Sequence, residues 1–296
     1  MYHLGIDIGG TFIKYALIEG EATIVKKWKK ETRLCETPEQ FYDYVCADID
    51  HLDEIDLIGV SAPGVIRSDS QVLSKAARTV RIMLGTNVNQ EVMKRLNKPT
   101  YTMNDAKAAG YCEMRIGNGQ HSQSSVYFVI GTGIGGCVCD KNGVIQGVDG
   151  IAGEFSSLPA GFDENGKVIG LASLASMDAL IHIYNAKVPC ERQLKYGTEI
   201  SQLYLENDPE AVEAMNEWCR NIAMGLHAIV IFYNPEIICL GGGISEEDWF
   251  IEKIRATYKE AKFSFPDLVT TKIDRCLFSN DANLLGAVLY AQSQQA

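Results

Sequence analysis

The sequence has no excess of positive charge and no long apolar run. Its 27 lysine and arginine residues face 38 aspartate and glutamate residues, which leaves a formal net charge of −11. Nucleic acids and anionic membranes attract basic surfaces, so this balance disfavours either of them as a partner. No stretch reaches the roughly 18 apolar residues of a membrane span. The N-terminus, MYHLGIDIGG, lacks the basic and apolar segments of a signal peptide, and we expect a cytoplasmic protein.

Cysteine shows no pattern of a disulfide framework or a metal site. The nine cysteines form an odd number and are scattered through predicted strands and helices. A chain of 296 residues can bury a sizeable core without cross-links, so we interpret them as small buried side chains in a reducing cytoplasm. Cys137 and Cys139 lie in a predicted strand without partners in the sequence, which favours core packing over metal binding.

No linker, low-complexity run or charge block divides the chain, but its predicted elements form two similar halves. Each half opens with a strand, a glycine-rich turn and two further strands, at residues 3–28 and 125–148. Repetition of this kind predicts a duplicated α/β domain with a cleft between the copies. A single α/β domain with two hairpins is the alternative. We place the domains at residues 1–118 and 119–280, and expect a C-terminal helix at about 281–296 to pack back onto the first.

The strongest local motif is formed by Asp7, Gly9, Gly10 and Thr11 in a turn between two apolar strands. This position excludes the Walker A and dinucleotide-binding motifs, because both of those open a helix. We expect the adjacent glycines to adopt positive φ angles and turn several backbone N–H groups toward a phosphate. Thr11 would add a hydroxyl donor, Lys14 a positive charge, and Asp7 a carboxylate that holds Mg²⁺ directly or through water. A plain hairpin turn capped by the aspartate is the alternative.

A second glycine-rich loop joins two strands at the equivalent place in the second half. It contains Gly131, Thr132, Gly133, Gly135 and Gly136. Four glycines in six residues are entropically costly for a mere turn, where two would suffice. Two such loops, one in each half, can grip the phosphates of a nucleotide, and the pair is far more specific than either loop alone.

A third glycine-rich segment, Gly241, Gly242, Gly243 and Ile244, lies between a buried strand and a helix. Glycines there would let a flat ring lie against the backbone, which predicts a contact with the adenine or ribose of a nucleotide. The alternative is a helix-entry turn with Ser245 as the N-cap, and both interpretations can hold together.

The catalytic candidate is Asp105, which follows Asn104 at the end of a predicted strand and the start of a helix. An aspartate there can accept the proton of a hydroxyl that attacks a phosphoryl group, while Asn104 holds neighbouring hydroxyls. Helix capping is the alternative for this pair.

Glu154 follows small residues in an irregular segment and is a candidate sugar ligand, with an ordinary solvated glutamate as the alternative. Gly64, in a turn after a buried strand, is expected to line the same cleft.

Taken in order, GIDIGGTFIK, SAPGV, NDAKAAGYCE, IGTGIGG, GIAGEF and LGGGIS resemble the ROK family of sugar kinases and repressors across essentially the whole chain. The resemblance implies the duplicated ribonuclease-H-like fold of actin, hexokinase and Hsp70, with ATP, Mg²⁺ and a sugar in the interdomain cleft. It implies Asp105 as general base, Asn104 and Glu154 as sugar ligands, and both loops as phosphate clamps. A homodimer is common among similar proteins. A repressor would need a helix-turn-helix ahead of the kinase-like part, and the sequence as given shows none.

The chain departs from the family pattern in the sugar-binding region. Ser157 stands where many ROK kinases have a histidine, and Ala172 where they have a second glutamate. Residues 161–180 contain neither cysteine nor histidine, so we expect no structural zinc. The small side chains would leave room at C1 or C2 of the sugar. We therefore expect phosphorylation of the 6-hydroxyl of a β-glucoside or disaccharide, with N-acetylmannosamine or free glucose as alternatives. A non-catalytic sugar-sensing protein is the alternative from another class.

Overall fold

A computed structural model describes residues 1–261, 265 and 267–295 of the chain. It divides into two compact units. Unit 1 comprises Met1–His121, Cys137–Ala152 and Leu277–Ala296, and unit 2 comprises Ser122–Gly136 and Gly153–Cys276. The chain therefore passes from one unit to the other after residues 121, 136, 152 and 276.

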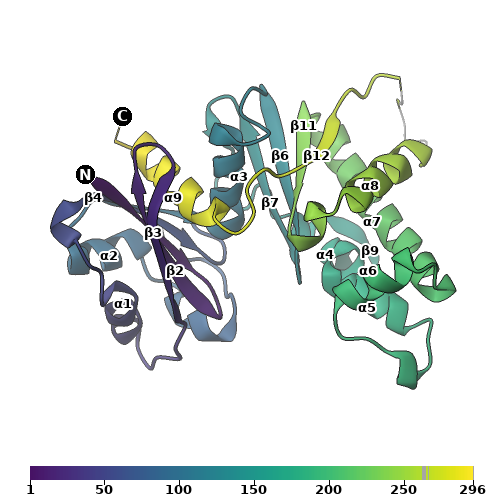
Figure 1. The fold of residues 1–296 in the computed structure, drawn as a ribbon, viewed down its shortest axis with the longest axis horizontal. Coiled ribbons are helices and arrows are strands. Elements are labelled where there is room, and N and C mark those ends of the chain that lie inside the picture. Colours follow the sequence, from purple (N-terminus) through teal and green to yellow (C-terminus); the bar gives the residue numbers. More distant parts are fainter. Residues whose placement is uncertain (262–264, 266, 296) are drawn as a thin grey trace. The chain divides into compact units, whose positions relative to one another are not determined.

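The elements follow one another as alternating strands and helices (Figure 1). The strands are β1 (Tyr2–Ile8), β2 (Phe12–Glu19), β3 (Thr23–Glu31), β4 (Ile55–Ala62), β5 (Thr100–Asn104), β6 (Ser124–Ile130), β7 (Ile134–Asp140), β8 (Gly143–Val144), β9 (Pro159–Phe162), β10 (Val168–Gly170), β11 (Ile237–Gly241) and β12 (Lys272–Arg275). The α-helices are α1 (Pro38–Cys46), α2 (Val88–Leu96), α3 (Asp105–Ile116), α4 (Ala172–Ala175), α5 (Met177–Asn185), α6 (Gly197–Leu205), α7 (Pro209–Tyr233), α8 (Asp248–Glu260) and α9 (Ala282–Ser293). Short 3₁₀ helices are η1 (Leu52–Glu54), η2 (Arg78–Met83), η3 (Phe155–Ser157), η4 (Cys190–Arg192) and η5 (Gly243–Glu246).

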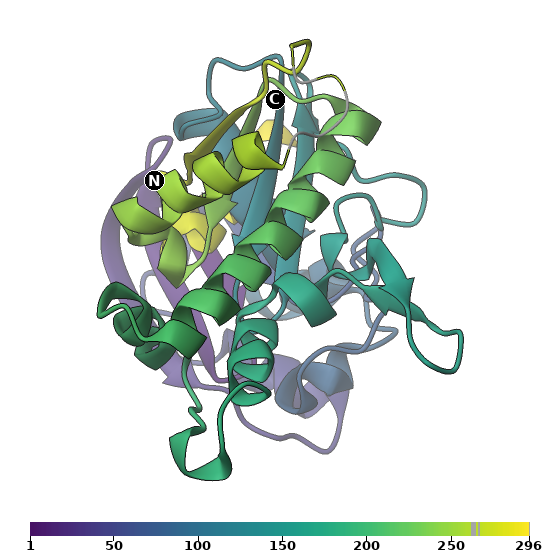
Figure 2. The same ribbon diagram turned by 90° about the vertical axis from the view of Figure 1, so that its right-hand side faces the viewer.

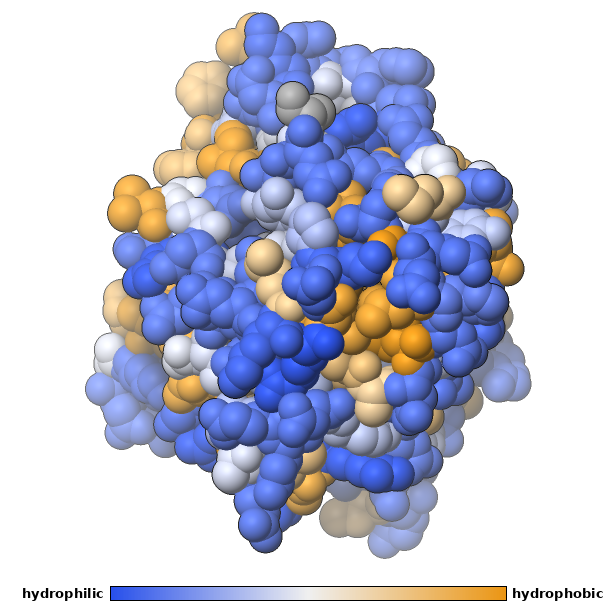
Figure 3. Space-filling view, turned by 90° about the vertical axis from the view of Figure 1, so that its left-hand side faces the viewer, coloured by the Kyte–Doolittle hydropathy of each residue, from blue (hydrophilic) through white to orange (hydrophobic). Residues whose placement is uncertain are grey.

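The sheet of unit 1 has the strand order β3–β2–β1–β4–β5. Strands β1, β2 and β3 pair antiparallel, whereas β4 and β5 run parallel to β1. The inner strands β1 and β4 are almost wholly buried, as their apolar sequences predict. The edge strand β3 alternates between exposed and half-buried residues and carries four lysines, which discourages pairing with a further strand. Figure 3, which views the molecule from the left of Figure 1, shows a largely hydrophilic face.

Helix α9 brings the C-terminal end of the chain onto the first sheet, and Figure 1 shows it in yellow beside the purple N-terminal strands. The helix packs against β4 and α3. Two glycines make this packing close: a Cβ on Gly59 would overlap the carbonyl oxygen of Ala287, and a Cβ on Gly286 would overlap that of Ala108. The backbone therefore approaches nearer here than any side chain would allow.

In unit 2, β6, β11 and β12 pair parallel to one another. The second sheet has the order β12–β11–β6–β7–β8, which repeats the connections of the first. Helix α7, seen along its length in Figure 2, packs against α4, α5, α6 and α8. Asp208 caps its first turn ahead of Pro209, and Asn234, with a φ of 50°, ends it. No helix among the described residues is long and apolar enough to cross a membrane.

Three predicted elements differ from the structure. The sequence pattern of residues 171–184 predicts a single helix, but the side chain of Ser176 caps α5, so α4 and α5 are separate. Within the stretch 143–148 only Gly143–Val144 pairs as a strand. The sequence predicts a last strand around residues 268–273, whereas the observed strand lies at Lys272–Arg275. In each case a local hydrogen bond or the register of the neighbouring strand outweighs the apolar pattern.

Candidate active site

The first glycine-rich turn joins β1 to β2, as expected, but neither Gly9 nor Gly10 has a positive φ. The prediction of a positive φ at these glycines was wrong. Glycine is needed at both positions because a side chain would not fit. A Cβ on Gly9 would lie 2.8 Å from the carbonyl oxygen of Phe12, and one on Gly10 would lie 2.8 Å from the Cβ of Ala77. The turn is therefore tightly packed against its own hairpin and against the segment before η2.

Asp7 is held at the end of β1 by three neighbours. Its side chain is 6% exposed, and its Oδ1 accepts hydrogen bonds from Ser61 at 2.8 Å and from the Nδ2 of Asn283 at 3.2 Å. The Nζ of Lys14 lies 3.5 Å from Oδ2. This carboxylate is therefore oriented and partly neutralised before any ligand binds.

The aspartate proposed as base lies at the first position of α3, directly after β5. Asn104 caps the helix, because its Oδ1 accepts from the backbone N–H of Lys107 at 3.1 Å. Its Nδ2 donates to the carbonyl of Gly64 and to Oδ1 of Asp105, each at 2.9 Å. Gly64 has a φ of 88°, a conformation that glycine adopts freely. The structure thus brings Gly64, Asn104 and Asp105 together, and Asn104 acts as a cap whatever else it binds.

Lys107 makes a contact that no motif in the sequence indicates. Only 1% of this residue is exposed, although it is a lysine. Its Nζ donates to the carbonyl oxygen of Gly150, in the segment that leads toward Glu154. The lysine therefore ties the start of α3 to that segment within unit 1.

The other candidate sugar ligand, Glu154, belongs to unit 2, where it precedes η3 and is half-buried. The two substituted positions lie on neighbouring segments of that unit. Ser157 ends η3 and Ala172 begins α4, and η3 packs against both α4 and β10. A Cβ on Gly170 would lie 2.5 Å from the carbonyl oxygen of Ser156, which shows how closely these segments approach. The structure therefore places Ser157 and Ala172 in one region of unit 2.

A cavity of about 500 Å³ lies entirely within unit 2. It brings the start of the second glycine-rich loop together with the third glycine-rich segment, as Gly131 and Thr132 share its wall with Gly243 and Ile244. Gly241 and Gly242 are not in the wall. The remaining lining residues come from the end of β6, the start of α5, the α6 region and the segment around α8: Ile130, Met177, Tyr196, Gly197, Thr198, Ser201, Gln202, Leu205, Glu247 and Trp249.

The second glycine-rich loop is held from both sides. The backbone N–H of Met177, at the start of α5, donates to the carbonyl of Gly131 at 2.9 Å. A Cβ on Gly136 would lie 2.6 Å from the Cε2 of Phe155, so the loop's last glycine is required by packing. Gly131, Gly133 and Gly136 have no positive φ. Close approach accounts for glycine at Gly136 alone, because a Cβ on Gly133 would meet no atom within 4 Å and one on Gly131 would lie 3.9 Å from the nearest atom.

Gly242 differs from the glycines of the two phosphate-binding candidates, the turn at Gly9 and the loop at Gly131, because its φ is positive. Its φ is 95°, and a Cβ on it would overlap the carbonyl oxygen of Ile130. Both the positive φ and the lack of space for a Cβ therefore require glycine at this position. The residue also sets the path of the backbone into Gly243 and Ile244.

Most residues of the cavity wall lie outside the motifs predicted from the sequence. Tyr196, Thr198 and Gln202 belong to the α6 region, which the sequence did not predict as a helix. A signal was present in Glu199, whose Oε2 accepts from the backbone N–H of Tyr196 at 3.0 Å in a capping arrangement. Trp249, beside the predicted N-cap segment of α8, carried no motif of its own.

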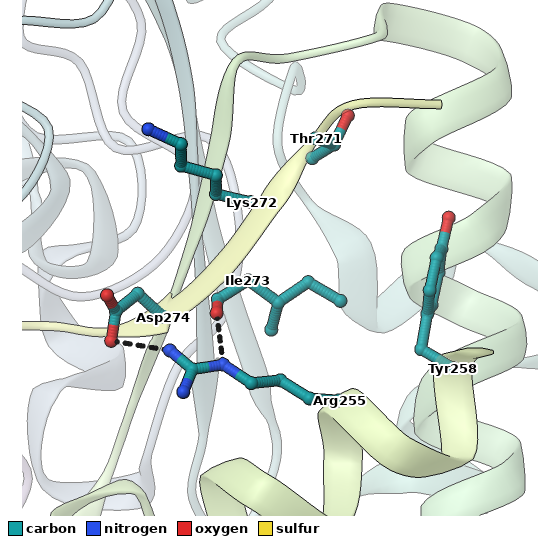
Figure 4. Close-up of a pocket in the computed structure, with 6 residues that line it drawn as sticks. All are labelled: Arg255, Tyr258, Thr271, Lys272, Ile273 and Asp274. Atoms are coloured by element: carbon teal, nitrogen blue, oxygen red, sulfur yellow. Dashed lines mark hydrogen bonds and ion pairs between the residues drawn. The ribbon is translucent and has the colours of Figure 1, made fainter. Parts of the chain in front are cut away.

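A smaller cavity of about 350 Å³ lies between α8 and β12 (Figure 4). The Nε of Arg255 donates to the carbonyl of Ile273 at 2.8 Å, and its Nη2 lies 3.1 Å from Oδ1 of Asp274. In Figure 4 the side chain of Lys272 points away from this guanidinium. None of the predicted site residues lines this cavity, so it is not part of the candidate active site.

Among residues 1–261, 265 and 267–295, no group of three or more histidine, cysteine, aspartate or glutamate residues could hold a metal ion. Cys137 and Cys139 are both buried in β7, with their sulfur atoms 3.5 Å apart.

The chain is similar to known proteins over its whole length. The ROK family profile matches residues 3–294. A β-glucoside kinase from Listeria innocua is 27% identical over 288 residues, covering 96% of this chain and 95% of the relative. An N-acetylmannosamine kinase from Escherichia coli K12 is 24% identical over 300 residues, covering all of both. A solved ROK family protein from Streptococcus pneumoniae, in complex with sucrose, has a TM-score of 0.86 at 26% identity and covers 100% of this chain and 99% of its own.

These comparisons confirm the resemblance and the fold class expected from the sequence, since both sheets match a ROK structure with the fold of actin and hexokinase. They also confirm the expected enzyme class, because the sugar kinases of this family are ATP-dependent phosphotransferases with hydroxyl acceptors. The chain belongs to the ROK family.

Proposed function

We propose that the chain transfers the γ-phosphoryl group of ATP to the 6-hydroxyl of a β-glucoside or disaccharide. The observation that carries this proposal is the cavity of unit 2, whose wall unites Gly131 and Thr132 with Gly243 and Ile244. Two glycine-rich segments more than a hundred residues apart, each a candidate for nucleotide binding from its own sequence, thus line one cavity. The apolar lining around Trp249 and Leu205 suits a purine ring.

Asp105 is the proposed base of the reaction. As the sugar oxygen attacks the γ-phosphorus in line, its proton passes to the Asp105 carboxylate and ADP leaves with the electrons of the broken bond. The bond from Asn104 to Oδ1 of Asp105 fixes the carboxylate in one orientation. Backbone N–H groups of the two glycine-rich loops stabilise the charge on the transferred group.

Asp7 is the proposed protein contact for Mg²⁺, which neutralises phosphate charge when it is bound with ATP. The carboxylate fits such a role through water better than by direct coordination. Its Oδ1 already accepts two hydrogen bonds, and Lys14 lies beside Oδ2. Magnesium commonly keeps several waters and takes few carboxylates from the protein when phosphates are also present. The remaining proposed phosphate contacts are Gly9, Gly10, Thr11, Lys14, Gly131, Thr132, Gly133 and Gly135.

The proposed acceptor follows from the small residues of the sugar-binding region. Gly64, Asn104 and Glu154 are the proposed ligands of the sugar hydroxyls, besides Asp105. Ser157 and Ala172 lie on adjoining segments, so both truncated positions leave space in the same region. An aglycone or second sugar would occupy this space, whereas an unsubstituted hexose would leave it to water and lose hydrogen bonds worth about 0.5–1.5 kcal/mol each.

A screen of ADP release should test the acceptor. We expect the highest kcat/KM with cellobiose or aryl β-glucosides, and lower values with free glucose. N-acetylmannosamine is the competing acceptor, because a 2-acetamido group would fill the same space and a relative with this activity matches the whole chain. Preference for N-acetylmannosamine would contradict the glucoside proposal and keep the kinase, whereas no ADP release with any sugar would contradict the kinase itself.

Nucleotide binding should be visible in the fluorescence of Trp249, which lines the cavity of unit 2. Adding a non-hydrolysable ATP analogue is expected to change the tryptophan emission, because the ring would contact the bound nucleotide. Trp249→Phe should remove that change. Trp28→Phe, a matched replacement on β3 of unit 1, should leave it intact. An unaltered signal in Trp249→Phe would place the nucleotide elsewhere.

A further inference from the structure

Glu113 is a buried carboxylate near the C-terminal end of α3 that the reaction scheme above does not use. It is 1% exposed. Its Oε2 accepts a hydrogen bond from the backbone N–H of Asn118 at 3.1 Å, and its Oε1 accepts one from the backbone N–H of Phe278 at 2.5 Å. The backbone N–H of Leu277 also hydrogen-bonds this side chain. Each donor belongs to unit 1, as Glu113 does.

These donors lie where the chain passes between its units. Asn118 comes shortly before the first passage, after residue 121, and Leu277 and Phe278 come directly after the last, at residue 276. One side chain therefore fastens the segment by which the chain first leaves unit 1 and the segment by which it finally returns. These segments are separated by more than 150 residues in sequence.

The surrounding backbone is shaped to accept this carboxylate. A Cβ on Gly117 would overlap Oε2 of Glu113 and lie 2.8 Å from its Cα. Gly117 has no positive φ, so glycine is needed here for space alone. Burial raises the pKa of Glu113, and the backbone N–H donors oppose that rise. A buried carboxylate is costly, and its hydrogen bonds to backbone groups at two separate places offset that cost.

Helix α3 connects this anchor to the proposed base. Asp105 is the first residue of α3 and Glu113 lies on the same unbroken helix. The eight-residue separation corresponds to about 12 Å along the axis of a continuous α-helix. A helix of this length moves as one piece, so the position of Asp105 depends on how the other end of α3 is held.

We propose that Glu113 is a positioning residue for phosphoryl transfer, which holds both passage segments against α3 and thereby keeps Asp105 in its reactive position. The inference rests on the proposed function. Glu113 touches no substrate in this scheme and acts only through the helix and the two segments. Its loss should therefore lower turnover without weakening nucleotide binding, because none of its hydrogen-bond partners, Asn118, Leu277 and Phe278, is a proposed nucleotide contact.

Glu113→Gln tests this directly, because glutamine keeps the shape and replaces one acceptor oxygen with a donor that faces a backbone N–H. We expect kcat to fall roughly 10- to 100-fold, the effect of a misplacement of about 1 Å. The dissociation constant of the ATP analogue, read from Trp249 fluorescence, should stay within about twofold of wild type. Gly117→Ala should give the same result by displacing the carboxylate while leaving it in the chain.

The control is Val92→Ala, which removes fully buried methyl groups from α2 in unit 1, away from both passage segments. It should lower Tm and leave kcat per folded molecule unchanged. The proposal would be overturned if both Glu113→Gln and Gly117→Ala kept the wild-type kcat per folded molecule. It would also be overturned if ATP affinity fell in parallel with kcat. In either case Glu113 would be a purely structural residue. A wild-type protein without sugar kinase activity would instead overturn the proposed function on which this inference rests.

Discussion

Replacing Asp105 with alanine is expected to lower kcat by roughly 10²- to 10⁴-fold, the usual contribution of a general base. The sugar hydroxyl would then lose its proton to water, a poorly placed and weaker acceptor. Nucleotide affinity should remain near that of wild type, because Asp105 is a proposed ligand of the sugar and not of the nucleotide, and it does not line the nucleotide cavity. Steady-state kinetics with the best acceptor and Trp249 fluorescence with the ATP analogue measure the two quantities separately.

Asp208→Ala is the matched control for this replacement. Asp208 also stands at the start of a helix, where its side chain accepts from the backbone N–H of Ala211 at 3.0 Å, and it pairs with Arg192. Its loss should cost about 0.5–2 kcal/mol of stability through the lost cap. It should leave kcat unchanged. If Asp105→Ala behaved in the same way, Asp105 would serve only to stabilise the start of α3, and the protein would be a candidate for sugar sensing without catalysis.

Replacing Gly242 with alanine is expected to weaken ATP binding roughly 10- to 100-fold, equivalent to about 1.4–2.7 kcal/mol. The backbone at Gly242 has a φ of 95°, and an added Cβ would overlap the carbonyl oxygen of Ile130. Relief of this overlap must shift the segment that leads into Gly243 and Ile244, which line the nucleotide cavity. Titration of the ATP analogue measures the loss.

Gly133→Ala separates this geometric effect from the loss of a glycine as such. Gly133 lies in the second glycine-rich loop, its φ is not positive, and an added Cβ would meet no atom within 4 Å. The variant should keep the stability of wild type, and any change in ATP affinity should come from contact with the phosphates alone. Equal stability of Gly242→Ala and Gly133→Ala by thermal unfolding would contradict the steric argument.

Much of the architecture could be predicted because its signals are local. The apolar runs of β1 and β4, the cap at Asp208 and the stop at Asn234 each act within a few residues, and the structure agrees with them. The sequence also indicated the glycine-rich turn at Gly9 and Gly10, but it predicted positive φ angles there, whereas the structure shows that close packing requires these glycines. Positive φ is a property of one residue and can be expected from sequence, whereas the approach of Ala77 to Gly10 depends on segments far apart in the chain.

The residues of the nucleotide cavity wall also depend on contacts between distant segments, which the sequence does not reveal. Gly243 and Ile244 belong to a recognisable glycine-rich segment, but Tyr196 and Trp249 reach the cavity only because α6 and α8 pack beside it. Ser61 and Asn283 likewise meet at Asp7 from β4 and α9. Such residues carry no motif, since their contribution is decided by tertiary packing.

The placement of α9 has a consequence for how this protein is made. Unit 1 begins at the first residue, yet the helix that packs against β1 and β4 spans Ala282–Ser293. Synthesis runs at about 5–20 residues per second, so the strands of the first sheet are made many seconds before α9, the helix that covers them. Unit 2, whose segments end at Cys276, is complete earlier. The part of the enzyme synthesised first is therefore the last to bury its core, and removal of the C-terminal helix would expose the sheet at the opposite end of the sequence.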